Sequence, residues 1–269
     1  MSLRGRQVID RLKHRVSSWL KLPCPPYGNT NYWDGVYKTL GPNDVHEWGN
    51  LTLKEDLLEY EYKILYPTSN EAAMLSSTFS EAINVHPLEM DKSILLLGCG
   101  NSKLGEDMVK HGWRGPLIQV DVVSRVLDTM AERCTSLVEQ GIMDFIHDDA
   151  TELSAFDNET IDAVVDKGLV DALFCADNYK QVEAICNSVH RVLMPGGIFC
   201  MFSFSQPEYL LPRVSLPHDD STEVPKWKDI QVQQLESILI YRFQKNDETK
   251  RHRGPSRESL QRKKKSKRR

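Results

Sequence analysis

A glycine turn that could hold a nucleotide lies at residues 94–105, where the sequence reads ILLLGCGNSKLG. Gly98 and Gly100 would let the backbone turn tightly and let a ligand approach it closely. A dinucleotide-binding turn carries a third glycine three positions later, where this chain has Lys103. The turn also lacks the Gly-Lys-Ser/Thr ending of a Walker A loop. The pattern therefore argues against NAD, FAD and a Walker A phosphate site.

Two acidic positions follow the turn, each at the end of a predicted strand. Asp121 ends the segment LIQVD, and an acid there suits the two hydroxyls of an adenosine ribose. Asp149 lies in DDAT and could accept a hydrogen bond from an adenine amino group. Taken singly, Asp121 could instead cap a helix and Asp149 could be an ordinary loop acid. Together with the glycine turn, they indicate a nucleoside ligand without a pyrophosphate.

The elements that would position these residues alternate along the chain. Continuous apolar runs such as SILLLG are typical of strands buried on both faces, and amphipathic stretches between them predict helices. We expect an α/β fold: a seven-stranded, mostly parallel, doubly wound (Rossmann-like) sheet with a C-terminal antiparallel hairpin. The predicted strands are 93–98, 116–123, 142–149, 160–168 and 198–204, the hairpin is 228–235 with 236–244, and the predicted helices are 101–112, 124–141 and 178–197.

Charge divides the chain into three parts. Residues 1–30 carry six Lys/Arg and one Asp, and residues 248–269 carry eleven Lys/Arg and two Glu, which leaves 17 basic and 35 acidic residues in 31–247. We predict a basic amphipathic arm over 1–30, an acidic globular domain over 31–247 and a disordered basic tail over 248–269. An acidic body does not attract nucleic acid, but it can steer a basic partner. Solubility alone is an alternative explanation of its charge.

The arms and the cysteines bear on location. The N-terminal arm fits an organelle transit peptide or a helix docked on the domain. Residues 262–269, RKKKSKRR, fit a nuclear address, a polyanion contact or a solvated tail. The chain contains no apolar run of membrane-spanning length. Its six cysteines form no C-x-x-C pair, which favours a reducing compartment and no metal site. We therefore expect the cytoplasm, with the nucleus or an organelle as alternatives.

Several motifs resemble one enzyme family. LLLGCGNSKLGEDM and IDAVVDKGLVDAL are similar to the first and fourth motifs of class I S-adenosylmethionine-dependent methyltransferases. LGCGNS with DKGxxDA, NYWDGVY, HEW and HRVLMPGGIF more narrowly resemble the branch that includes the elongation factor 1A lysine methyltransferases. The resemblance covers roughly residues 31–245. It implies S-adenosyl-L-methionine as the cofactor and leaves the two arms outside.

The resemblance also implies roles for individual residues. Gly98 would contact the amino-acid part of the cofactor, Asp121 and Val122 the ribose, and Asp149 and Ala150 the adenine. Aromatic residues would cover the pocket, because a sulfonium cation is favoured near aromatic faces, although they could equally form a hydrophobic plug. The residues implied in cofactor binding are Trp33, Tyr37, Trp48, Gly98, Gly100, Asp121, Val122, Asp149, Ala150 and Lys167.

The sequence departs from the branch at two positions that bear on the acceptor. Leu169 stands where the branch has threonine, and Gly49 follows Trp48 where an aromatic residue is common. Methyl transfer mainly requires alignment of donor and acceptor, and a carboxylate can assist the acceptor amine. Asp166 is the first candidate for that role and Asp171 the second, while a helix cap is the alternative for Asp166.

These observations favour one function among several. We expect lysine or N-terminal amine methylation of a basic protein such as elongation factor 1A. A small-molecule methyltransferase and an inactive cofactor-binding scaffold are the alternatives. A NAD oxidoreductase ranks last because of Lys103.

Overall fold

The computed structural model describes residues 25–45, 91–110, 112–215, 227–235 and 238–247. Both predicted basic arms and the segment that contains Trp48 lie outside the described residues. No helix in the described part of the chain combines the length and the apolar character that crossing a membrane requires.

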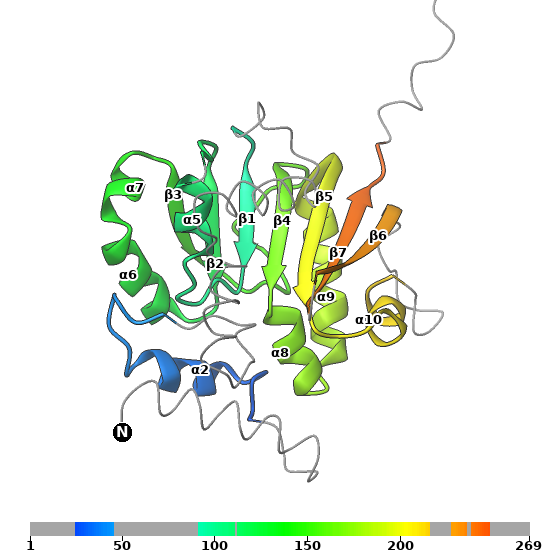
Figure 1. Cartoon of the computed structure of the whole chain (residues 1–269), viewed down its shortest axis with the longest axis horizontal. Coiled ribbons are helices and arrows are strands. Elements are labelled where there is room, and N and C mark those ends of the chain that lie inside the picture. The colour runs from blue at the N-terminus through cyan, green and yellow to red at the C-terminus, as the bar shows by residue number, and fades with distance from the viewer. Residues whose placement is uncertain (1–24, 46–90, 111, 216–226, 236–237, 248–269) are drawn as a thin grey trace, which may run out of the picture.

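A seven-stranded sheet forms the centre of the molecule, in the order β3-β2-β1-β4-β5-β7-β6 (Figure 1). Its first five strands in that order are parallel, and β7 runs antiparallel to both β5 and β6. This arrangement confirms the predicted mostly parallel sheet with its C-terminal hairpin. The strands are β1 (Ile94–Leu97), β2 (Leu117–Asp121), β3 (Met143–His147), β4 (Ile161–Lys167), β5 (Leu193–Ser203), β6 (Trp227–Leu235) and β7 (Ile238–Lys245).

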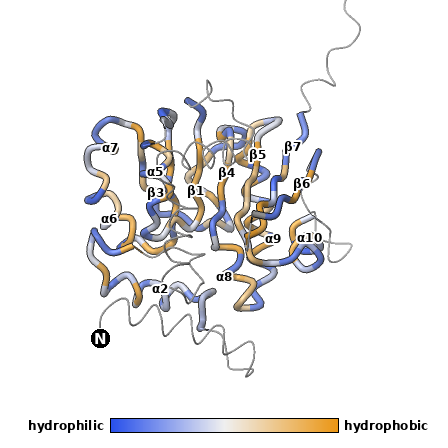
Figure 2. The backbone as a smooth tube through the Cα atoms, in the orientation of Figure 1, coloured by the Kyte–Doolittle hydropathy of each residue, from blue (hydrophilic) through white to orange (hydrophobic). Residues whose placement is uncertain are grey.

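Helices cover both faces of the sheet, as a parallel sheet requires. One apolar cluster joins the strands to α8 and α9, and the other joins them to α5 and α6. All four residues of β1 are buried, and Figure 2 shows the apolar strands between more polar helices. The helices are α2 (Thr30–Tyr37), α5 (Leu104–Lys110), α6 (Ser124–Arg133), α7 (Thr135–Glu139), α8 (Leu169–Cys175), α9 (Tyr179–Val192) and α10 (Pro207–Val214).

Two predicted helices differ from those observed. The predicted helix 124–141 is broken at Cys134 into α6 and α7, and its N-cap is Val123, without a capping side chain. The predicted helix 178–197 ends at Val192, and Leu193–Gly197 belong to β5. Leu193 already pairs with Ile161 of β4, and after a shift of register Ile198 pairs with Ala163. The Pro-Gly-Gly sequence between these pairs therefore lies within β5 and does not mark the end of a helix.

Close packing of α5 against the sheet does not need a glycine at position 103. A Cβ on Gly105 would lie 2.9 Å from Nε2 of Gln119 and 3.2 Å from Cε of Met143. Gly105 therefore allows the close helix–strand approach that the third glycine provides in a dinucleotide-binding turn. The glycine pattern of a dinucleotide-binding turn does not reveal this close packing, because it places the third glycine at position 103 and this chain has it at position 105.

Candidate functional site

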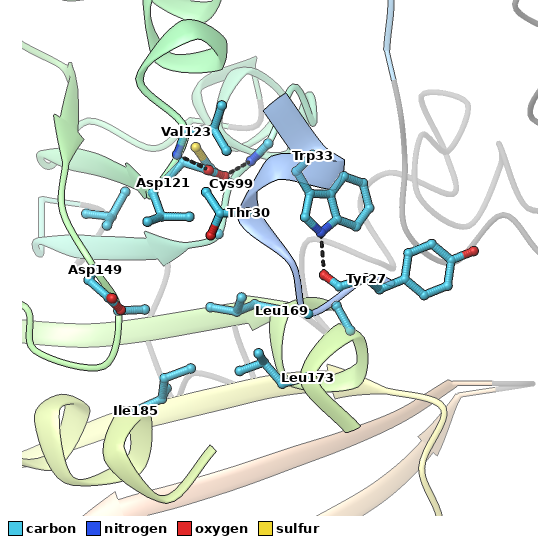
Figure 3. Close-up of a pocket in the computed structure, with 18 of the residues that line it drawn as sticks. Tyr27, Thr30, Trp33, Cys99, Asp121, Val123, Asp149, Leu169, Leu173 and Ile185 are labelled. Carbon is cyan, nitrogen blue, oxygen red and sulfur yellow. Dashed lines mark hydrogen bonds between the residues drawn. The ribbon is translucent and has the colours of Figure 1, made fainter. Parts of the chain in front are cut away.

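A pocket opens at the carboxyl ends of β1, β2, β3 and β4, which is where ligands bind in parallel α/β sheets. Nine of the ten residues predicted to bind the cofactor line it, and the tenth, Trp48, lies outside the described residues. In Figure 3, Asp121 and Cys99 lie on one side of the pocket, and Leu169, Leu173 and Ile185 on the other. The structure thus brings the predicted residues together, while their contacts with a ligand remain a prediction.

The glycine turn provides open backbone at the pocket floor. Gly98 and Gly100 have φ values of +53° and +52°, a conformation that residues with a side chain rarely adopt. A Cβ on Gly98 would lie 2.9 Å from Cβ of Leu169, and one on Gly100 would lie 2.7 Å from Oη of Tyr37. Side chains at these positions would therefore collide with Leu169 and Tyr37, two residues that line the pocket.

Asp121 holds the turn in place from the end of β2. Its Oδ2 accepts a hydrogen bond from the Gly100 N–H and its Oδ1 accepts one from the Val123 N–H, both at 2.9 Å. Burial raises the pKa of this carboxyl, whereas hydrogen bonds from the N–H groups of Val123, Gly100 and Val122 lower it. The Asp121 carboxylate in turn contributes to raised pKa values for Tyr37 and Cys99, after the larger effect of their burial. Asp121 is therefore a structural anchor of the turn as well as a pocket-lining residue.

The end of β3 contributes two acids with different surroundings. Asp148 accepts hydrogen bonds from Ala155 N–H at 2.8 Å and from the Ser154 hydroxyl at 3.0 Å. Asp149 accepts from the N–H and the hydroxyl of Thr151 through the same oxygen, Oδ1, at 2.8 and 2.7 Å. Asp149 therefore makes the local turn that we considered as its alternative role. Because these bonds use one oxygen, the geometry remains compatible with a contact from Asp149 to adenine.

A short aromatic helix, α2, forms another wall of the pocket. Its N-cap is Asn29, whose side chain accepts the Asn31 N–H at 2.9 Å. The ring of Trp33 stacks between Tyr27 and Tyr37, with centroid distances of 5.8 and 5.9 Å. The Trp33 indole N–H donates to the Tyr27 carbonyl at 2.5 Å, as Figure 3 shows. The wall is therefore packed internally, as a hydrophobic plug would be, and its residues also line the pocket.

Asp166 is not among the residues that line the pocket. It is fully buried, and its Oδ1 accepts the N–H of Leu169 at 2.9 Å, at the start of α8. Burial, and then the charge of Asp171, raise its pKa to about 8, although hydrogen bonds from Leu169 and Val170 lower it. This geometry favours the helix-capping alternative over a catalytic role for Asp166.

Asp171 also points away from the pocket lining and organises the end of β5. Its carboxylate accepts hydrogen bonds from the Ser203 hydroxyl and from the Phe204 N–H, the latter at 2.9 Å. The side chain is buried. Asp171 therefore ties α8 to the residues after β5, and its geometry provides no direct path to an acceptor in the pocket.

Some pocket residues could not be predicted from the motifs. Tyr27, Thr30 and Cys99 belong to or adjoin recognised segments, so proximity in sequence was the available signal. Leu173 is the last residue of the recognised segment IDAVVDKGLVDAL, whereas Gln181 and Ile185 come from α9, which the sequence indicates only as an amphipathic helix. The described residues hold no group of three or more His, Cys, Asp or Glu side chains that could bind a metal ion.

Replacing Gly100 with alanine should weaken cofactor binding. The new Cβ would lie 2.7 Å from Tyr37 Oη, so Tyr37 must move and the pocket wall with it. Gly141→Ala is a matched control, because Gly141 has φ +69° with no atom within 4 Å of a Cβ and does not line the pocket. Both variants should lose about 1 kcal/mol of stability from backbone strain. Calorimetric titration with S-adenosylhomocysteine should show about ten-fold weaker binding for Gly100→Ala alone, and equal affinities would contradict a close fit at this turn.

A family model matches the part of the chain that carries the strand ends of the pocket. Residues 95–201 match a family described as "Methyltransferase domain". The segment runs from β1 to β5 and so includes the glycine turn, Asp121 and Asp149.

Several individual proteins are similar to this chain in sequence. The human "eEF1A lysine and N-terminal methyltransferase" is 31% identical over 187 residues, and its mouse counterpart is 27% identical. Each alignment covers 68% of this chain and 22% of the relative, so the chain spans about a fifth of their length. The bovine "EEF1A lysine methyltransferase 4" is 26% identical over 195 residues, which cover 68% of this chain and 64% of that protein.

Among solved structures, a protein of Methanococcus maripaludis has the same fold. Its crystal structure is described as that of a candidate S-adenosyl-L-methionine-dependent methyltransferase. It aligns with a TM-score of 0.50 and 10% identity, over 76% of this chain and 98% of that one.

Proposed function

We propose that this chain, a class I S-adenosyl-L-methionine-dependent methyltransferase, transfers a methyl group to an amine of a protein. The favoured acceptor is a lysine side chain in a basic protein such as a translation elongation factor, with an N-terminal amine as the related alternative. The observation that carries the proposal is that Gly98, Asp121 and Asp149, which suit a nucleoside ligand, line one pocket at adjoining strand ends. These strand ends lie in the segment that matches a methyltransferase domain. The names of the relatives support the choice of acceptor.

The cofactor would lie across the ends of β1, β2 and β3. Gly98 would contact its amino-acid part, Asp121 and Val122 its ribose, and Asp149 and Ala150 its adenine. The aromatic wall of α2 would lie near the sulfonium, whose positive charge is favoured beside aromatic rings. When bound, the cofactor supplies a methyl group that its sulfonium already activates, so the chain has mainly to align the donor with the acceptor.

The acceptor amine must lose a proton before or during transfer, and the three carboxylates that line the described pocket, Asp121, Asp148 and Asp149, all accept hydrogen bonds from the chain itself. Asp121 is held by two backbone N–H groups, and Asp166 lies outside the lining with a pKa raised to about 8. We therefore propose that the chain binds the neutral amine and aligns it, rather than removing its proton through a dedicated carboxylate. The rate should then rise with pH until the acceptor amine is deprotonated.

The charge of the domain is consistent with a basic protein substrate. Residues 31–247 carry 17 basic and 35 acidic side chains. A surplus of that size steers positively charged partners toward the surface and repels polyanions such as nucleic acid. The effect should weaken with added salt, because surface charges are screened over about 8 Å at physiological ionic strength.

A transfer experiment in cell lysate tests the proposed function. Lysate of the source cells would be incubated with methyl-labelled S-adenosylmethionine and with the intact chain, Asp121→Ala or the exposed-site control Asp128→Ala. We expect a discrete labelled protein band with the intact chain and the control, and none with Asp121→Ala. Label confined to small molecules would contradict protein methylation, and bound cofactor without any transfer would indicate an inactive scaffold.

A further inference from the structure

A buried arginine at the end of α6 contacts the glycine turn from outside the pocket. Nη1 of Arg133 donates to the carbonyl of Asn101 at 3.1 Å, and Nη2 donates to the carbonyl of Ser102 at 2.9 Å. Nη2 also lies 2.6 Å from a carboxylate oxygen of Glu106 in α5, and the Arg133 side chain is only 8% exposed. The planar guanidinium can serve several acceptors at once, which a lysine ammonium cannot reproduce in the same geometry.

The same arginine reaches the residues that follow the aromatic helix. We call residues 25–45, which contain α2, the aromatic segment. Nη1 of Arg133 lies 3.5 Å from the carbonyl of Pro42, and Nδ2 of Asn101 donates to the carbonyl of Asp44 at 2.7 Å. The end of the aromatic segment is therefore joined to the glycine turn both directly through Asn101 and indirectly through Arg133.

A second, weaker connection joins the aromatic segment to α6. Arg125 lies 3.3 Å from Asp34, but both side chains are about half exposed. Exposed ion pairs of this kind contribute little to stability and are screened by salt. Of these polar connections, the ones through Arg133 and Asn101 are therefore those that can fix the position of the segment, beside the apolar packing of Tyr37 in the core.

We infer that Arg133 is a positioning residue of the cofactor site, which keeps the aromatic segment against the glycine turn. It does not line the pocket and has no direct role in the transfer. It acts on the two elements that do line it, because Trp33 and Tyr37 belong to the aromatic segment and Gly98 and Gly100 to the turn. This inference rests on the proposed cofactor site, since it concerns the same pocket.

Calorimetric titration with S-adenosylhomocysteine tests the inference, because it separates affinity from the fraction of competent protein. Arg133→Gln removes the positive charge, whereas Arg133→Lys keeps a charge opposite Glu106 but loses the planar guanidinium that serves several acceptors. Arg125→Gln is the control, because Arg125 also lies in α6 and also contacts the aromatic segment, through Asp34. We expect Kd to rise about ten-fold or more for Arg133→Gln and by an intermediate factor for Arg133→Lys. Arg125→Gln should stay within about two-fold of the wild type.

A purely structural role for Arg133 gives a different result. If Arg133 only stabilised the fold, its variants would contain less folded protein, and the measured number of binding sites per chain would fall. The molecules that remain folded would bind S-adenosylhomocysteine with the wild-type Kd. An unchanged Kd in Arg133→Lys overturns the inference, and this variant decides the matter if Arg133→Gln fails to fold. Failure of the wild type itself to bind would instead overturn the proposed cofactor site, and the inference with it.

Discussion

Asp121→Ala should nearly abolish cofactor binding while the chain still folds. The substitution removes the acceptor of the Gly100 and Val123 N–H groups and the carboxylate proposed to meet the ribose hydroxyls. Each hydrogen bond to a charged group is worth about 1.5–3 kcal/mol, so a loss of at least about 100-fold in affinity for S-adenosylhomocysteine is expected. Calorimetric titration measures it, with circular dichroism to verify the fold.

Two further variants separate charge from general disturbance. Asp121→Asn keeps one acceptor oxygen but presents an NH₂ group toward one of the two backbone N–H donors, so it should bind nearly as weakly as the alanine variant. Asp128→Ala removes an exposed carboxylate of α6 that does not line the pocket and should bind like the wild type. A Kd for Asp121→Ala within about three-fold of the wild type would exclude Asp121 from cofactor binding, since that factor is below the value of one such bond.

The strand ends could be predicted from sequence because burial on both faces leaves a distinct pattern. β1 is a continuous apolar run and β4 has an apolar centre at residues 163–165, and their neighbours in a parallel sheet follow from the alternation with helices. Once the strands are known, Asp121 and Asp149 must lie at the same edge as the glycine turn. The order of the strands alone therefore predicted that these residues lie close together, without knowledge of any side-chain contact.

The direction of the Asp166 side chain depends on the register of the sheet, which the predicted strand bounds did not fix to one residue. Leu97 pairs with Val120 on one side and with Asp166 on the other, so Asp121 lies one residue beyond the level of Asp166. Successive side chains of a strand point to opposite faces of the sheet. Asp121 therefore lines the pocket, whereas Asp166 accepts the N–H of Leu169 at the start of α8.

Long-range contacts account for the other features that sequence did not reveal. In the sequence, Arg133 lies in the middle of the predicted helix 124–141 and reads as an ordinary charged residue of that helix. Its contacts with Pro42 and Asn101 depend on how the aromatic segment lies over the turn. Such contacts join positions far apart in the chain, and no local pattern specifies them.

Asp166→Asn should make the protein more stable at alkaline pH and remove a pH dependence of its stability. Burial and the neighbouring Asp171 raise the pKa of Asp166 from 3.8 to about 8, so the folded state holds a proton that the unfolded chain releases. Between the two values, the free energy of unfolding falls by about 1.4 kcal/mol per pH unit because of this group. The stabilisation is therefore complete below the unfolded pKa and is lost as pH rises through about 8.

Urea unfolding between about pH 5 and pH 9 measures this effect as the difference between variant and wild type. Asparagine can still accept the Leu169 N–H through its oxygen, so α8 should keep its cap. The advantage of Asp166→Asn should grow with pH and level off above about pH 8, whereas the exposed-site control Asp157→Asn should show a constant difference. Parallel curves would mean that Asp166 is already ionised in the fold. Methyl transfer should persist in Asp166→Asn, because a cap does not need the charge that a catalytic base requires.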